Sequence, residues 1–158
     1  MAATSASRAV QEQPVTFRSH CGAFVLHGTL TTPAASQTAS GSALVKAPPC
    51  LLLHGGMAHG DSAYHKPLAR SLATRLGCTS FRFHHVGCVA PASTNGEGEA
   101  VEQTRNMMSG FWHDLEDARE AVRFLRSKHG IRIRWLCGHS RGGQLALMLA
   151  LRHGVELG

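Results

Sequence analysis

The chain has 158 residues, of which 43% are hydrophobic and 16% charged, a composition typical of one small globular domain with its own core. No apolar run approaches the roughly 18 residues that a membrane-spanning helix requires, so we expect no membrane span. The net charge of +6 comes from 16 basic and 10 acidic residues. The basic residues are scattered, and the densest stretch, Arg123 to Arg134, covers an expected helix end, which disfavours a nucleic-acid partner.

The N-terminus and the cysteines indicate the setting of the domain. Residues 1–13 are small and polar and lack the apolar core of a secretory signal, so we expect a disordered start followed by one domain over residues 14–158. The alternative is a transit peptide, against which Glu12 and the single arginine argue. The odd number of cysteines and the absence of CxxC pairs favour free thiols and a reducing, cytoplasmic location. The five are Cys21, Cys50, Cys78, Cys88 and Cys137.

The first half of the chain predicts strands and one helix. Residues 14–30 predict two strands joined by a tight turn at residues 20–22, and residues 31–49 a loop. The apolar run at residues 50–53 predicts a strand buried on both faces. An apolar helical stripe comprises Leu68, Leu72 and Leu76. Asp61 or Ser62 can cap this helix at its start and Gly77 at its end. Residues 79–83 predict the next strand.

The second half alternates between helix and strand. A polar loop at residues 91–102 precedes a helix over residues 111–128, which Gly130 closes. Its predicted apolar side carries Trp112, Leu115, Ala118, Val122 and Leu125, and its polar side Asp114, Glu116, Arg119, Glu120 and Arg123. A strand at residues 131–137 and a helix at residues 144–153, apolar on nearly all sides, complete the pattern. This order predicts an α/β fold with a mostly parallel sheet after an antiparallel start.

A motif marks the turn between that last strand and helix. It reads Gly138-His139-Ser140-Arg141-Gly142 and matches G-x-S-x-G in the strand–turn–helix context that the motif requires. A nucleophile on so tight a turn needs small neighbours, so we expect Ser140 to be the nucleophile and Gly138 and Gly142 to let strand and helix pass closely. The alternative is a glycine-rich turn that binds a phosphate, or nothing.

A second motif, Leu53-His54-Gly55-Gly56, follows the earlier buried strand. Acyl transfer builds negative charge on a carbonyl oxygen, and N–H donors must already point toward it. We expect the backbone N–H groups of Gly56 and Arg141 to form this oxyanion hole. The alternative is an exit loop with no chemical role.

Together these motifs resemble the α/β-hydrolase superfamily, in particular its serine aminopeptidase-like and esterase-like members. The resemblance extends from about residue 14 to the C-terminus and is carried by residues 51–56, residues 81–83 with Gly87, and residues 136–143. It implies an α/β-hydrolase-type sheet, a triad in the order Ser, acid, His, and a structural role for the His before the oxyanion glycine. We therefore expect the N-terminal portion of one such domain, truncated after the nucleophile-elbow helix.

Two departures from the family pattern qualify this expectation. Relatives often carry Asp-x-Arg-Gly where this chain has residues 84–87, His-His-Val-Gly. After Ser140 only residues 141–158 remain, and His153 and Glu156 stand in the wrong order to complete a triad. The acid and the base of the triad are thus expected to be absent from this chain. The alternative is a replacement base from His54 or His84.

Other chemistry finds little support in the sequence. His84, His85 and Cys88 lie close together, and Cys137 and His139 flank the elbow, but paired zinc-ligand spacing is missing, so we expect no metal. No dinucleotide or Walker motif predicts a cofactor. A thiol-based redox sensor that uses Cys137 or Cys88 is a further alternative, although a cysteine buried in a strand is usually inert.

The leading functional hypothesis is a serine hydrolase of ester, thioester or amide bonds. It would act on a small-molecule acyl substrate through an acyl-enzyme on Ser140, inactive or weak in this chain without the missing triad members. The alternative is a non-catalytic binding or regulatory remnant of the same fold. The strand at residues 131–137 should form an uncovered sheet edge, so self-association through that edge is also expected.

Overall fold

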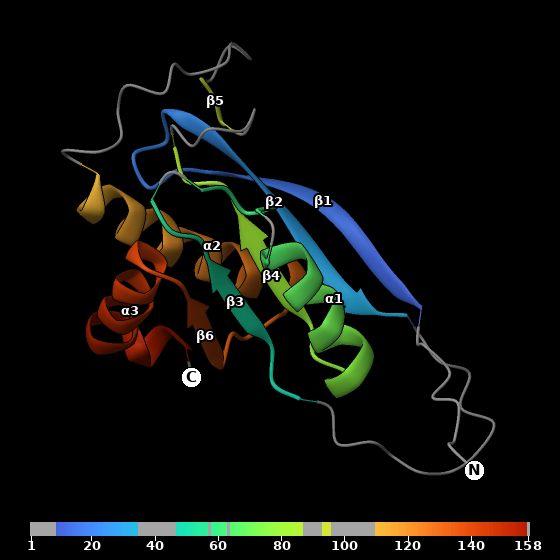
Figure 1. Cartoon of the computed structure of the whole chain (residues 1–158). Coiled ribbons are helices and arrows are strands. Elements are labelled where there is room, and N and C mark those ends of the chain that lie inside the picture. The colour runs from blue at the N-terminus through green and yellow to red at the C-terminus, as the bar shows by residue number, and fades with distance from the viewer. Residues whose placement is uncertain are drawn as a thin grey trace, which may run out of the picture.

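The computed structural model of the chain describes residues 9–34, 47–56, 58–62, 64–86, 93–95 and 110–157. These residues fold into a twisted sheet with helices on both faces (Figure 1). The strands are β1 (Val10–Arg18), β2 (Phe24–Pro33), β3 (Cys50–Leu53), β4 (Ser80–Phe83), β5 (Ser93–Asn95) and β6 (Trp135–Gly138). The helices are α1 (His65–Leu76), α2 (Phe111–His129) and α3 (Arg141–Leu157).

The sheet has the predicted mixture of strand directions. Its order is β1-β2-β4-β3-β6, and β5 pairs with β2 off this path. β2 runs antiparallel to β1 and to β4, whereas β3 runs parallel to both β4 and β6. The α/β fold with an antiparallel start is therefore confirmed, and β3 lies between β4 and β6. In the part of the chain that the structure describes, β6 is an edge strand.

Strand β3 is buried on both faces, as its unbroken apolar run predicts. Leu51 and Leu53 pack into the main core with α2 and α3, whereas Cys50 and Leu52 pack against α1. Side chains alternate along a strand, so one run of four apolar residues serves both layers. Helices therefore cover both faces of the sheet at β3 (Figure 1).

Strand β4 follows the same alternation but places a charge inside. Phe81 and Phe83 join the main core, while Arg82 points to the opposite face and is only 2% exposed. A buried guanidinium needs charged or polar partners. Those partners come from β1, β2 and the loop before α1.

Several strand boundaries differ from the prediction, because pairing across the sheet decides where a strand ends. β1 begins at Val10 rather than at residue 14, since residues 10–13 pair with residues 30–33 of β2. For the same reason β2 extends into the predicted loop. β5 lies within the predicted loop at residues 91–102, and β6 begins only at Trp135.

The predicted C-caps of α1 and α2 are confirmed, whereas the predicted N-cap of α1 is wrong. Gly77 and Gly130 close α1 and α2 in the left-handed conformation, with φ of +61° and +64°. The N-cap of α1, however, is Tyr64. Asp61 binds Arg82 instead, and the hydroxyl of Ser62 donates to the carbonyl of His59 at 2.6 Å, so neither side chain caps the helix.

The predicted faces of α2 and α3 need correction. Asp114 was assigned to the polar side of α2 but is 7% exposed, and Trp112 on the apolar side is 51% exposed. On α3, Leu147 and Leu151 are 62% and 72% exposed, so the helix is not covered on all sides by the described residues. The buried carboxylate of Asp114 has a specific partner at the elbow.

Candidate active site

Ser140 occupies the turn between β6 and α3. Its φ of +53° lies in the left-handed region, and it is the only non-glycine residue in the described ranges with a positive φ. The N–H groups of Gly143 and Gln144 donate to its carbonyl at 2.9 and 3.2 Å, so the first turn of α3 holds this conformation. A strained, exposed serine at a strand-to-helix turn is the geometry of a nucleophile elbow.

Two glycines allow the turn to be this tight. A Cβ atom on Gly138 would overlap the carbonyl of Gly142, and a Cβ on Gly142 would overlap the carbonyl of Leu53. Strand β6, helix α3 and the end of β3 therefore approach one another more closely than any side chain permits. The spacing of the motif thus has a direct steric reason.

The loop after β3 lies against this elbow. The Cβ position of Gly55 is 3.4 Å from the Cβ of Ser140, and that of Gly56 is 3.8 Å from the Cδ of Arg141. Among the described residues, neither the N–H of Gly56 nor that of Arg141 has a hydrogen-bond acceptor. Two unoccupied donors therefore lie beside the serine at the carboxyl edge of the sheet.

An ion pair that the sequence did not predict fixes the side chain of Arg141. Its Nε and Nη2 atoms lie 2.9 and 2.7 Å from Oδ2 of Asp114 in the first turn of α2. The guanidinium also lies 5.9 Å from the centre of the Phe111 ring. The residue after the proposed nucleophile is thereby anchored to α2. Acidic residues are common in the first turn of a helix because they interact favourably with the helix dipole. The sequence pattern of α2 therefore did not indicate that Asp114 pairs with Arg141.

His54 is a structural histidine. Its Nε2 atom accepts a hydrogen bond from the backbone N–H of His85 at 3.2 Å, so Nδ1 carries the proton and donates to the carbonyl of Gly55 at 2.8 Å. Burial, together with the neighbouring His85 ring, lowers the pKa of His54 to about 2. Burial likewise lowers the pKa of His85 to about 3. Neither ring is charged near neutral pH, and His54 has no nitrogen left for Ser140.

His139 and Tyr64 form a pair at the rim of the site. The hydroxyl of Tyr64, at the start of α1, lies 2.9 Å from Nδ1 of His139, and the two rings meet edge to face. The pair joins the elbow to the loop before α1 across 75 positions of sequence. No local pattern links these two residues, so the sequence could not indicate the contact.

A family model described as the alpha/beta hydrolase fold matches residues 48–157. The chain belongs to this family. The matched region contains both motifs that carry the proposed site. No protein of curated function matches the chain by sequence.

Solved structures agree with this assignment at the level of the fold. The α/β-hydrolase chain is similar to a cold-adapted esterase from an Arctic intertidal metagenomic library, with 21% identity over 92% of this chain and 57% of that one and a TM-score of 0.64. Est1E from Butyrivibrio proteoclasticus, with ferulic acid bound, is 19% identical over 85% of this chain and 46% of Est1E, with a TM-score of 0.59. A puromycin-hydrolyzing peptidase from Mycobacterium tuberculosis is 22% identical over 89% of this chain and 20% of the peptidase, with a TM-score of 0.58. Our chain thus spans between 20% and 57% of these structures.

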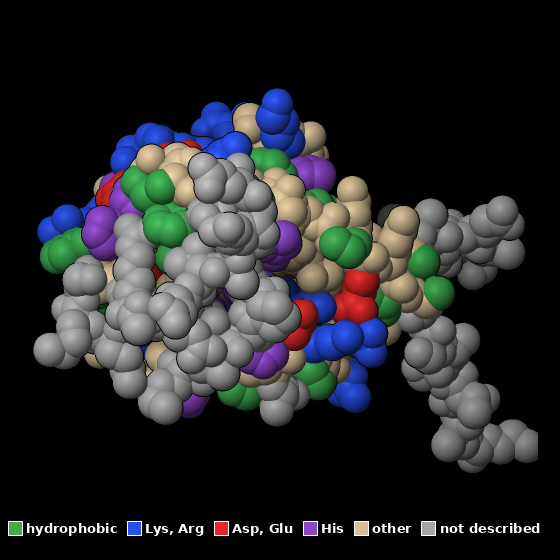
Figure 2. Space-filling view, turned by 90° about the horizontal axis from the view of Figure 1, so that it is seen from above, with side chains coloured by type: hydrophobic (Ala, Val, Ile, Leu, Met, Phe, Trp, Pro, Cys, Tyr) green, Lys and Arg blue, Asp and Glu red, His purple; other side chains and the backbone are tan. Residues whose placement is uncertain are grey.

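Histidines are common around the site of this α/β-hydrolase chain. Figure 2 looks down on the top of Figure 1, the carboxyl edge of β3, β4 and β6, and histidine side chains appear at several places on this face. His153 does not lie with these histidines at Ser140, because its Nε2 lies 3.6 Å from Oε1 of Glu116 on α2.

Of the residues considered as metal ligands, Cys88 lies outside the described residues. Within those residues no group of three His, Cys, Asp or Glu side chains is arranged to hold a metal ion, and no helix combines the length and apolar character that a membrane crossing requires.

Proposed function

We propose that the chain is part of a serine hydrolase that cleaves ester, thioester or amide bonds of small-molecule acyl substrates. The observation that carries the proposal is the strained Ser140, placed against the Gly55-Gly56 loop with two unoccupied N–H donors beside it. Structural similarity to esterases and a peptidase is consistent with the same class of reaction.

The reaction follows from these positions. The Oγ atom of Ser140 attacks the acyl carbon, and the oxyanion that forms accepts hydrogen bonds from the N–H groups of Gly56 and Arg141. Each such donor contributes on the order of 3 kcal/mol to the transition state. The bond to the leaving group then breaks, the leaving group takes the serine proton by way of a base, and water hydrolyses the acyl-enzyme. Residues beyond those described here must supply that base.

A non-catalytic binding or regulatory role of the same fold is the second candidate. One observation favours it, namely that no imidazole among the described residues hydrogen-bonds to the hydroxyl of Ser140. A protein of this kind would keep the acyl-binding geometry without turnover.

A fluorophosphonate probe separates the two candidates. We expect the probe to bond to Oγ of Ser140, because the elbow exposes this atom and the two N–H groups stabilise the phosphonyl oxygen. Mass spectrometry of the peptide that contains Ser140 measures the fraction labelled over several hours. Ser140→Ala should remove the label, whereas Ser127→Ala, an exposed serine on α2, should not change it. Equal labelling of wild type and Ser140→Ala would favour the binding role.

We also propose that the chain self-associates through β6 and the neighbouring face of α3. Trp135 is 42% exposed on this edge strand, and Leu147 and Leu151 are exposed on α3, which packs against β6. Unpaired strand edges and exposed apolar side chains favour association. Sedimentation velocity should show a weight-average mass that rises with concentration. Trp135→Lys should shift the distribution toward monomer, whereas Leu76→Lys, at a similarly exposed leucine on α1, should not. A wild-type monomer at all concentrations, with one sharp reversible unfolding transition, would contradict this proposal.

A further inference from the structure

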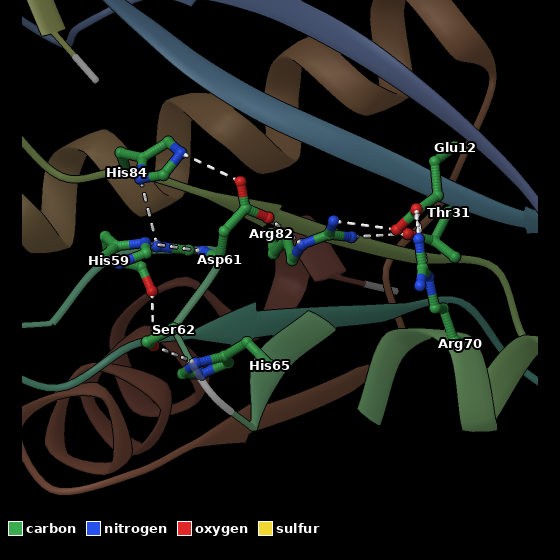
Figure 3. Close-up of polar contacts among 10 residues, drawn as sticks. Glu12, Thr31, His59, Asp61, Ser62, His65, Arg70, Arg82 and His84 are labelled. Carbon is green, nitrogen blue, oxygen red and sulfur yellow. Dashed lines mark hydrogen bonds and ion pairs between the residues drawn. The ribbon is translucent and has the colours of Figure 1, made fainter. Parts of the chain in front are cut away.

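A network of charged and polar side chains connects β1 to the loop before α1, and Arg82 lies at its centre (Figure 3). The buried guanidinium of Arg82 donates to Oδ1 of Asp61 at 2.8 Å, to Oγ1 of Thr31 at 2.7 Å and to Oε1 of Glu12 at 3.0 Å. The other carboxylate oxygen of Glu12 binds Arg70 at the surface. Two carboxylates thus balance two guanidinium groups, which makes it possible to bury Arg82.

The loop partner of Arg82 is charged near neutral pH. Burial alone would raise the pKa of Asp61, but the hydrogen bond and charge of Arg82 hold it below its ordinary value. The side chain of Asp61 is 41% exposed, whereas that of Arg82 is 3% exposed. Asp61 is therefore the partner on the surface loop, and Arg82 is the partner buried in the sheet to which the loop is attached.

A second contact joins the same loop to the end of β4. The backbone N–H of Gly60 donates to Nδ1 of His84 at 3.2 Å. The Cβ position of Gly60 lies 2.7 Å from the carbonyl oxygen of Phe83, so the loop rests directly on the backbone of β4. Burial lowers the pKa of His84, despite the nearby charge of Asp61, and the neutral ring keeps the lone pair that accepts this bond.

A third contact holds the loop at its other end. It is the hydrogen bond from the N–H of His85 to Nε2 of His54, already described. Gly56 lies between the two attachment points, and four residues span at most about 14 Å from Gly56 to Gly60. The end of β4 therefore limits where the N–H of Gly56 can lie relative to Ser140.

We propose that Arg82 and His84 are positioning residues that hold the Gly60–Ser62 turn on β4 and thereby keep the N–H of Gly56 beside Ser140. We call the Asp61–Arg82 ion pair, the Gly60–His84 hydrogen bond and the His54–His85 hydrogen bond the β4 clamp. This inference rests on the proposed hydrolase function for its catalytic consequence. Its structural half, attachment of the loop by these side chains, can be tested without any activity.

The test compares variants of the 158-residue chain by hydrogen–deuterium exchange of the peptide that contains Gly60 and Asp61. Asp61→Ala removes the loop side of the ion pair and leaves Arg82 bound to Glu12 and Thr31, so the buried guanidinium keeps one carboxylate partner. We expect exchange of this peptide to become at least about tenfold faster. Arg70→Met, which removes the exposed end of the network without touching the loop, should leave exchange unchanged.

His84 allows a rescue experiment with a conservative variant. His84→Leu removes the acceptor for the Gly60 N–H, whereas His84→Asn places an amide oxygen near the position of Nδ1 and keeps an acceptor there. We expect faster exchange in His84→Leu and near wild-type exchange in His84→Asn. A general loss of packing would affect both variants alike, so a difference between them reports the hydrogen bond itself.

Fluorophosphonate labelling of Ser140 in the same variants tests the catalytic consequence. Loss of one oxyanion donor costs about 100-fold or more, so a loosened Gly56 should slow labelling by at least about tenfold in Asp61→Ala and His84→Leu, but not in Arg70→Met or His84→Asn. Unchanged exchange in Asp61→Ala and His84→Leu would overturn the clamp. Faster exchange with unchanged labelling would overturn its link to Gly56. If the wild type is not labelled above Ser140→Ala, the proposed function fails, and the exchange result still decides the structural half.

Discussion

The 158-residue chain is expected to hydrolyse p-nitrophenyl acetate about 10⁴- to 10⁶-fold more slowly than an intact serine esterase. The reason is the position of its histidines. His54 uses both ring nitrogens in backbone hydrogen bonds, His139 is bonded to Tyr64, and His153 lies beside Glu116 on α2. None of them is in place to take the proton of Ser140, so only the elbow and the N–H donors contribute.

The measurement is the initial rate of p-nitrophenol release by purified chain, with Ser140→Ala as the control. A small rate that falls to the background in Ser140→Ala would agree with the expectation. Hydrolysis at the rate of ordinary esterases, and dependent on Ser140, would mean that a base reaches the serine from residues outside the described ranges. That result would refute the prediction of weak activity while supporting Ser140 as the nucleophile.

Gly142→Ala is expected to abolish stable folding, with a loss of more than about 3 kcal/mol in the free energy of unfolding. A Cβ atom at this position would overlap the carbonyl of Leu53 at the end of β3, which lies between β4 and β6 in the sheet. The backbones of α3 and β3 would have to move apart, and we expect this movement to disrupt the parallel pairing of β3 with β6.

Gly143→Ala is the matched control for this substitution. The Cβ position of Gly143 lies 3.4 Å from the carbonyl oxygen of Gly138, an ordinary contact, and the residue is within α3. Alanine is favoured over glycine in a helix by about 1 kcal/mol, so this variant should be as stable as wild type or more stable. Urea unfolding followed by circular dichroism compares the three proteins. Equal midpoints for Gly142→Ala and wild type would contradict the close approach of α3 to β3.

Much of the fold was predictable because its signals are local. The apolar run at residues 50–53 predicts a strand buried on both faces, since only a central strand loses solvent on both sides. Gly77 and Gly130 mark helix ends because they adopt the left-handed conformation without strain. The motif around Ser140 is also a local signal, because a tight turn restricts the size of residues within a few positions of it.

The surroundings of the site were less predictable, because they depend on contacts between distant residues. Nothing near Asp114 in the sequence indicates that its carboxylate binds Arg141, 27 positions later, rather than solvent. Arg82 similarly looked like one of many scattered basic residues until the register of β1 and β2 brought Glu12 and Thr31 to it.

Sterics over a few residues govern turns, caps and strand alternation, so the sequence alone was enough to predict the α/β fold, the tight turn at Ser140 and the glycine loop beside it. The packing of the whole chain was needed to show which charges are buried and what holds the loop in place. It paired Arg82 with Asp61, Gly60 with His84 and Tyr64 with His139. Such pairs form because a buried polar group requires a partner, and which partner it meets is set by the packing of whole strands and helices.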